Sequence, residues 1–118
     1  MASTYRELIV WQKAMRLVTL VYEATRAFPK EEIYALTSQV RRCAVSIPSN
    51  IAEGNGRKSR TDYVRFLQIS VGSLYELETQ VEIAKNLGYL TAQVFDERTL
   101  FMREIERMLS SLVRKLSS

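Results

Sequence analysis

The chain has 118 residues, of which 47% are hydrophobic and 25% are charged, with a formal net charge of +4 at pH 7. This length is typical of one domain with a substantial core, so we predict a single domain over residues 1–118. The hydrophobic content excludes an intrinsically disordered chain, which combines low hydrophobicity with high net charge. Histidine is absent and cysteine occurs once, which excludes imidazole-based metal sites, histidine general bases and internal disulfides.

No stretch of the sequence has the unbroken hydrophobic run of a signal peptide or the ~20 hydrophobic residues of a membrane-spanning helix. The single cysteine, Cys43, fits a reducing compartment, and its hydrophobic neighbours predict that it packs in the core. We therefore expect a cytoplasmic protein without membrane association.

The first predicted helix runs from about Glu7 to Ala27. Its hydrophobic residues recur at steps of three and four, which is the period of a helix face. They form two neighbouring arcs: Leu8, Trp11, Met15, Val18 and Tyr22, and beside them Val10, Ala14, Leu17 and Val21. This hydrophobic surface is wider than one neighbouring helix needs, so we expect part of it to form an interface between copies.

The second predicted helix runs from about Lys30 to Glu53. Pro48 lies inside this segment and lacks a backbone N–H, so we expect a kink or a local break there. The glycines of Gly54–Gly56 are predicted to stop the helix. Its hydrophobic stripe consists of Ile33, Leu36, Val40, Ala44, Ile47 and Ile51, and Val45 and Ala52 lie on another face.

Two more helices are predicted, from about Arg60 to Leu87 and from about Ala92 to Leu116. Ser59 and Thr91 precede them as N-caps, and Gly88 is a natural end for the third helix. No strand-like alternation competes with this pattern. Four amphipathic helices with short connections predict an all-α fold, an up-down antiparallel four-helix bundle.

The sharpest charge signal is the segment between the second and third helices. Arg57, Lys58 and Arg60 stand at the N-terminus of the third helix, where free N–H groups and the helix dipole favour anions. We take these three residues as candidate contacts to nucleic-acid phosphates, with Arg41 and Arg65 as weaker candidates. The alternative is a solvated basic loop.

A polar stripe accompanies the hydrophobic face of the second helix. Two interpretations remain open: a site in which Arg42 orients a substrate beside the carboxylates of Glu53 and Glu76, or a buried network that fixes how the helices pair. For the network we expect Arg42 to form an ion pair with Glu76 or Glu53. The complete set of candidate network residues is Gln39, Arg42, Ser46, Asn50, Glu53, Ser73 and Glu76.

Glu78 and Glu82 lie four residues apart and suggest Mg²⁺ binding, as in helical nucleotide pyrophosphohydrolases. The fuller acidic patterns of such enzymes are missing, and two acids on one helix face are commonly solvated. We expect no metal, no cofactor and no catalytic residues.

Several sequence segments together resemble one bacterial family. The string Ser-Ile-Pro-x-Asn-Ile-Ala-Glu-Gly is the most specific of them. The segments are Trp11–Met15, Phe28–Glu32, Leu36–Arg42, Val45–Gly54, Phe66–Leu67 and Gly72–Glu76. They resemble the four-helix-bundle proteins found in intervening sequences of 23S rRNA genes, apart from Cys43, where an alanine is usual.

This resemblance implies a small cytoplasmic bundle that assembles into a ring, expected to be a pentamer. It also implies similarity to the accessory proteins of diversity-generating retroelements, basic rings that contact nucleic acid and a reverse transcriptase. We therefore expect a non-enzymatic, self-associating protein that binds RNA or DNA backbone. The alternatives are an adaptor that binds another protein and, more remotely, a carboxylate- and Mg²⁺-dependent enzyme.

Overall fold

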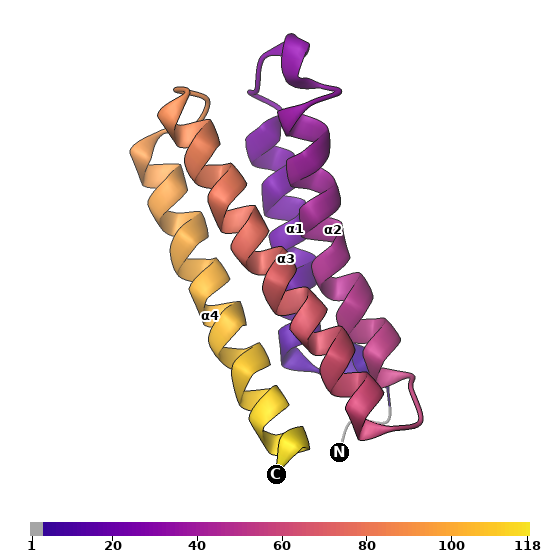
Figure 1. Cartoon of the computed structure of the whole chain (residues 1–118). Helices are drawn as coiled ribbons and strands as arrows, with labels where there is room; N and C mark the ends of the chain where they lie inside the picture. The colour runs from indigo at the N-terminus through magenta and orange to yellow at the C-terminus, as the bar shows by residue number, and fades with distance from the viewer. Residues whose placement is uncertain (1–3) are drawn as a thin grey trace.

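The computed structural model describes residues 4–118, which form four α-helices and no strand. Short connections join the helices, and successive helices run in alternate directions (Figure 1). The prediction of an all-α four-helix bundle is therefore confirmed. The elements in chain order are η1 (Tyr5–Glu7), α1 (Ile9–Thr25), η2 (Lys30–Glu32), α2 (Leu36–Asn55), α3 (Arg60–Asn86) and α4 (Ala92–Ser117), where η denotes a 3-10 helix.

Every α-helix contributes side chains to one continuous hydrophobic core. The inner arc of α1 is buried, as its period predicts, and Cys43 also lies in the core. No helix among residues 4–118 is both long enough and hydrophobic enough to cross a membrane. The largest fully buried hydrophobic side chains are Leu17, Ile47, Ile51, Leu67, Leu74, Leu77, Met102, Ile105 and Leu109.

The predicted helix caps are present. The side chains of Ser59 and Thr91 each accept a hydrogen bond of 3.1 Å from a backbone N–H in the first turn of the following helix. Gly88 has a φ of 82°, a left-handed conformation that glycine adopts without strain. Backbone bonds of 2.9 Å from Gly88 to Lys85 and from Tyr89 to Ala84 complete a Schellman motif, so α3 ends where the glycine requires it.

Two helix starts differ from the prediction. Residues Tyr5–Glu7 form η1 rather than the start of α1, and α2 begins at Leu36 rather than near Lys30. Ala35 has a non-helical backbone (φ −123°, ψ −107°) that separates η2 from α2. The carboxylate of Glu32 accepts bonds from the Leu36 N–H (3.3 Å) and the Tyr89 hydroxyl (2.8 Å), which holds this turn against the α3–α4 connection.

Of the kink or local break expected at Pro48, the break does not occur, because α2 continues through this residue to Asn55. Proline in a helix interior costs about 3 kcal/mol through the lost hydrogen bond and a steric clash. Ile47 and Ile51 on either side are completely buried, and each buried side chain contributes about 1.5–3 kcal/mol. Core packing therefore offsets the cost of Pro48.

The segment Gly54–Gly56 was expected to stop the second helix, and α2 does end at Asn55 with Gly56 as its C-cap. Gly54 itself, however, lies inside α2 and is buried. A Cβ at Gly54 would lie 2.7 Å from Cβ of Phe66 and 3.1 Å from the Tyr63 ring on α3. Real Cβ atoms do not approach so closely, so only a glycine at this position allows α2 and α3 to lie so near each other. Its role is close packing between the helices rather than termination.

We expect Gly54→Ala to lower the free energy of unfolding by about 1–3 kcal/mol, the usual cost of overpacking a core. Urea unfolding at one fixed protein concentration measures the change. Gly72→Ala is the matched control, because a Cβ at Gly72 in α3 meets no atom within 4 Å. That control should gain up to about 1 kcal/mol from helix propensity. Equal effects in the two variants would contradict the close-packing role of Gly54.

Candidate functional site

The basic loop between α2 and α3 lies at the end of the bundle where α1 begins and α4 ends (Figure 1). Arg57, Lys58 and Arg60 are all exposed there. Ser59 caps the first turn of α3, so its side chain orders the loop directly beside these cations. The structure thus brings the three main candidate residues together at one helix N-terminus.

Two arginines at this end are held by neighbouring side chains. Arg57 forms an ion pair of 2.7 Å with Glu53, and its guanidinium lies 4.8 Å from the centre of the Phe66 ring. Arg65 lies 4.6 Å from the same ring centre, and its Nε is 3.8 Å from Asp62. These two side chains cover Phe66, so they contribute to the fold as well as to the surface charge.

Lys58 and Arg60 have no carboxylate within 4.0 Å anywhere in residues 4–118. Tyr63 is the one aromatic residue of the predicted interface, and its hydroxyl accepts a bond of 3.2 Å from Asn55. Its ring also packs against the core, so it offers no free platform for a nucleobase. The unpaired charge of the loop is therefore concentrated on Lys58 and Arg60.

Arg41 does not join this group. It lies near the other end of α2, where its Nε donates a bond of 2.8 Å to Thr25 and its guanidinium lies 4.6 Å from the Tyr22 ring centre. Fourteen helical steps separate Arg41 from Asn55, which corresponds to roughly 20 Å along α2. The structure therefore separates Arg41 from the loop residues, because residues of one helix that are far apart in sequence are also far apart along its axis.

The last turns of α4 add to the basic end instead. A groove lined by Arg60, Arg65 and Ser117 lies between the start of α3 and the end of α4. Exposed Arg114 and Lys115 stand on the last turn of α4, where cations also interact favourably with the helix dipole. The sequence shows an excess of basic residues after residue 97, from which these cations could have been predicted. Their position near the loop depends on the packing of α4 against α3.

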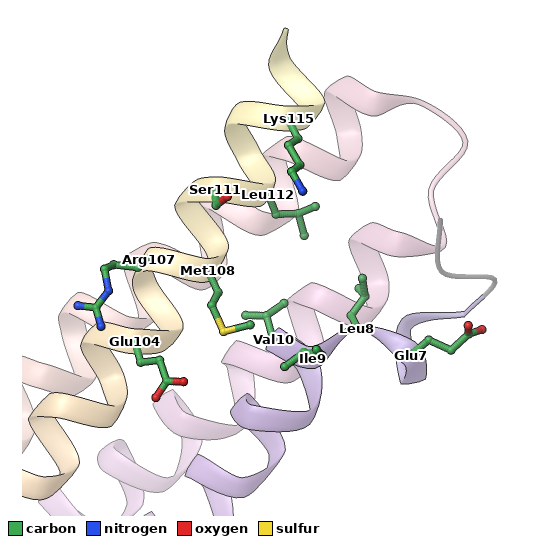
Figure 2. Close-up of a pocket in the computed structure, with 10 residues that line it drawn as sticks. All are labelled: Glu7, Leu8, Ile9, Val10, Glu104, Arg107, Met108, Ser111, Leu112 and Lys115. Carbon is green, nitrogen blue, oxygen red and sulfur yellow. The ribbon is translucent and has the colours of Figure 1, made fainter.

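A second groove of about 690 Å³ separates the start of α1 from the second half of α4. Figure 2 shows Met108 and Leu112 of α4 facing the segment that carries Leu8 and Val10. Ile9 in this groove is 58% exposed. The remaining lining residues are Glu7, Glu104, Arg107, Ser111 and Lys115, and Glu104 forms an ion pair of 2.8 Å with Lys13. The groove is largely hydrophobic at its centre.

Part of the predicted polar stripe forms a seam between α2 and α3. The hydroxyls of Ser46 and Ser73 are hydrogen-bonded at 2.7 Å, and the Asn50 amide donates a bond of 2.8 Å to the carbonyl of Ser46. Ser70, which the stripe did not include, is completely buried and donates a bond of 2.9 Å to the carbonyl of Ile47. The serine bonds join two closely packed helices, whereas the Asn50 bond lies within α2.

The charged members of the stripe are not buried in this seam. Arg42, Glu53 and Glu76 are exposed, as is the predicted network residue Gln39. Arg42 has no carboxylate partner among residues 4–118, so the expected buried ion pair is absent. Arg42 projects from the side of α2 opposite the core, since the residues that face α3 are Cys43 and Ser46. Glu53 instead pairs with Arg57, on the adjoining loop.

Cys43 lies in the same seam, where its thiol donates to the carbonyl of Ser73 at 3.0 Å. Burial raises the pKa of this thiol to about 12, and the nearby carboxylate of Glu76 adds to the shift. The thiol is therefore neutral at physiological pH, whereas nucleophilic attack and metal binding require the thiolate. The structure supports the prediction that Cys43 is a small core residue.

The acidic residues do not assemble a metal site within the part of the chain that the structure describes. Glu78 and Glu82 line a shallow groove between α3 and α4 together with Asp96 and Arg103. Desolvation raises the pKa of Glu78, as does the negative charge of Glu106, while Arg103 lowers it. Glu76 accepts a bond of 3.2 Å from Gln80 and lies beside Cys43, whereas Glu53 lies roughly 15 Å further along α2, so the two do not form a carboxylate pair.

We expect Arg42→Ala to change the free energy of unfolding by less than about 0.5 kcal/mol, as is usual for an exposed side chain without a partner. Ser70→Ala should lower it by about 0.5–1.5 kcal/mol or more, because it removes a buried hydrogen bond. Urea unfolding of both variants at one protein concentration compares them. A larger loss for Arg42→Ala than for Ser70→Ala would show that Arg42 does have a structural partner.

Comparison with known proteins places this fold in a family. Residues 6–111 match the family described as 23S rRNA-intervening sequence protein. A comparison with curated proteins finds no match. Among solved structures, the fold is similar to that of a protein of unknown function of the S23 ribosomal protein family from Bacteroides thetaiotaomicron VPI-5482. The TM-score is 0.82 and the sequence identity 22%, over 90% of this chain and 96% of that chain. At this sequence identity, the similarity to the solved structure shows a shared fold. The match over residues 6–111 shows that the chain belongs to the family of 23S rRNA-intervening sequence proteins.

Proposed function

We propose that this protein is a non-enzymatic, self-associating binding protein of the cytoplasm that holds RNA or DNA by its phosphate backbone. One observation carries the nucleic-acid part of the proposal. Lys58 and Arg60 are exposed and have no carboxylate partner, at the N-terminus of a 27-residue helix. A bound phosphate is the group that this arrangement favours.

The electrostatics of the loop support this role. The N-terminus of α3 carries about half a positive charge, so cations placed there are unfavourable for folding. Asp62 in the first turn offsets part of this repulsion, and Glu53 neutralises Arg57. Lys58 and Arg60 have no such compensation, whereas phosphates would relieve the repulsion and release counterions. Backbone contacts of this kind carry little sequence preference.

The family match is compatible with this proposal without specifying it. The family description refers to intervening sequences of 23S rRNA, which is a gene location rather than a mechanism. The solved relative is itself described as a protein of unknown function. Support for nucleic-acid binding therefore comes from the residues of the basic end and from the likeness to accessory proteins of diversity-generating retroelements.

We expect the double variant K58A/R60A to bind RNA and DNA of all sequences more weakly than the parent does. Each lost phosphate contact should reduce the log–log salt slope by about 0.9 for duplex DNA, so two contacts reduce it by roughly 1.8. Fluorescence anisotropy over a range of salt concentrations measures both effects. Arg57 is left in place, because the loss of its contacts with Glu53 and Phe66 would affect folding as well as binding.

The matched control is R16A/R42A, which removes the same charge from exposed positions on α1 and α2. This control should keep the parent salt slope. If K58A/R60A and the parent bind nucleic acid equally well, or if neither binds it, the backbone-binding role is wrong and the protein-adaptor role becomes the better explanation.

Self-association is supported by the outer flank of α1 and α2. Met15 and Tyr22 of α1 are 45% and 40% exposed, and Val45 of α2 is 40% exposed. Trp11 and Val18 lie partly buried on the same α1 flank. Exposed hydrophobic side chains that gather along two neighbouring helices are typical of an interface between subunits. We propose that this flank joins copies of the chain into the ring that the family resemblance implies.

We expect light scattering of the parent protein to give the mass of a closed oligomer, with a pentamer as the proposed state. Val45→Lys places a charge at the proposed interface and should shift the protein to smaller species, because a closed ring repeats the charge at every contact. Gln68→Lys adds the same charge on the exposed face of α3 and should leave the mass unchanged. A parent protein that remains monomeric would contradict the proposal.

A further inference from the structure

A separate cationic groove lies at the end of the bundle opposite the basic loop, where α1 leads through η2 into α2 (Figure 1). Its volume is about 460 Å³. Arg26, Lys30 and Arg41 line it together with two threonines, Thr25 and Thr37, and no acidic residue lines it. The charged residues that line it are therefore all positive.

The three cations of this groove are not used in ion pairs. None of them has a carboxylate oxygen within 4.0 Å in residues 4–118. The nearby acid Glu32 is occupied by the Leu36 N–H and the Tyr89 hydroxyl. Arg26 and Lys30 are exposed, so both can turn toward a ligand in the groove.

Arg41 is already oriented. Its Nε bond to Thr25 and its position 4.6 Å from the Tyr22 ring centre hold the guanidinium in place. Thr25 in turn donates to the carbonyl of Val21 at 2.9 Å, so this anchor is itself satisfied. The terminal N–H groups of Arg41 have no acceptor among the described residues, which leaves them available to an anion. A pre-oriented arginine loses less side-chain entropy when it binds.

Thr37 supplies a second, independent indication of a ligand. It is only 2% exposed, and its hydroxyl has no hydrogen-bond partner in the described chain. Buried hydroxyl groups are almost always paired, and leaving one unpaired is unfavourable. Thr37 lies in the first turn of α2, whose N-cap residue Ala35 provides no side-chain cap. Threonine in a helix has two accessible χ1 rotamers, so a rotation can turn this hydroxyl toward the groove.

We propose that this groove is a binding site for a phosphate group, held by Arg26, Lys30 and Arg41 with Thr37 as a hydroxyl donor. Three cations and a hydroxyl suit a multiply charged oxyanion better than a carboxylate, which carries one charge on two oxygens. The phosphate is either that of a small phosphomonoester or one phosphate of a nucleic-acid strand. The site lies roughly 20 Å along α2 from the basic loop and does not depend on the loop's proposed function.

The test is isothermal titration of the K58A/R60A protein with inorganic phosphate at constant ionic strength, so that the basic loop makes no contribution. We expect saturable binding of phosphate and no comparable binding of acetate. In this background R26Q/K30Q should weaken phosphate binding by roughly tenfold or more, since each change removes a charge-assisted hydrogen bond. The control R16Q/R42Q removes the same charge elsewhere and should bind as the background protein does.

Thr37→Val keeps the shape of the side chain and removes only the hydroxyl. We expect weaker phosphate binding with an unchanged or higher melting temperature, which a structural role for the hydroxyl would not produce. The proposal is overturned if the background protein does not bind phosphate, if acetate binds equally well, or if R26Q/K30Q binds phosphate as tightly as the control does. These outcomes are independent of whether the loop binds nucleic acid.

Two RNA oligonucleotides of one sequence, with and without a 5′-phosphate, distinguish the sources of the phosphate. Tighter binding of the 5′-phosphorylated strand identifies a terminal phosphate as the ligand. Equal binding of the two strands, lost in R26Q/K30Q, identifies an internal phosphate. If inorganic phosphate binds and neither RNA strand binds more tightly than inorganic phosphate does, the ligand is a small phosphomonoester.

Discussion

The close approach of α2 and α3 is the constraint on which the rest of this structure depends. Gly54 has no Cβ, which allows Phe66 to pack directly against the α2 backbone. Ser70 and the Ser46–Ser73 pair hydrogen-bond the two helices where larger side chains would force them apart. Because the helices are this close, only residues 56–59 are needed to connect them. The position of the basic loop is thus a consequence of the helix packing.

The up-down arrangement also determines how charge is distributed. It places the N-terminus of α3 at one end of the bundle and the N-terminus of α2 at the other, so each end carries the positive dipole end of one of these helices. Lys58 and Arg60 stand at the first of these ends, whereas Arg26, Lys30 and Arg41 gather at the second. None of these five cations is paired with a carboxylate within residues 4–118, so none stabilises the fold through an ion pair. Their arrangement favours anionic ligands at two separate places.

Between these ends, the reactive side chains of the described residues are dispersed. The one thiol is neutral because it is buried, and the carboxylates do not converge on a common site. Hydrophobic side chains remain exposed along the α1–α2 flank and in the groove beside Ile9. In the single chain the outer arc of α1 is only partly covered, because Trp11 and Val18 pack against the core whereas Met15 and Tyr22 remain exposed.

The sequence by itself determined the helices, their caps and the inner core, because these depend on hydrophobic period and on local hydrogen bonds at Ser59, Gly88 and Thr91. It also indicated the exposed loop cations, since a short polar connection must lie at the surface.

Only the tertiary structure decided which polar residues meet. Arg42 and Ser46 are four residues apart on α2, yet only Ser46 reaches a partner on α3. The continuity of α2 through Pro48, the role of Gly54 and the separation of Arg41 from the loop likewise depend on contacts between distant segments. The helical period specifies which residues of a helix lie on the same face. The packing of the helices decides which neighbouring residue meets that face and at which point along the helix axis.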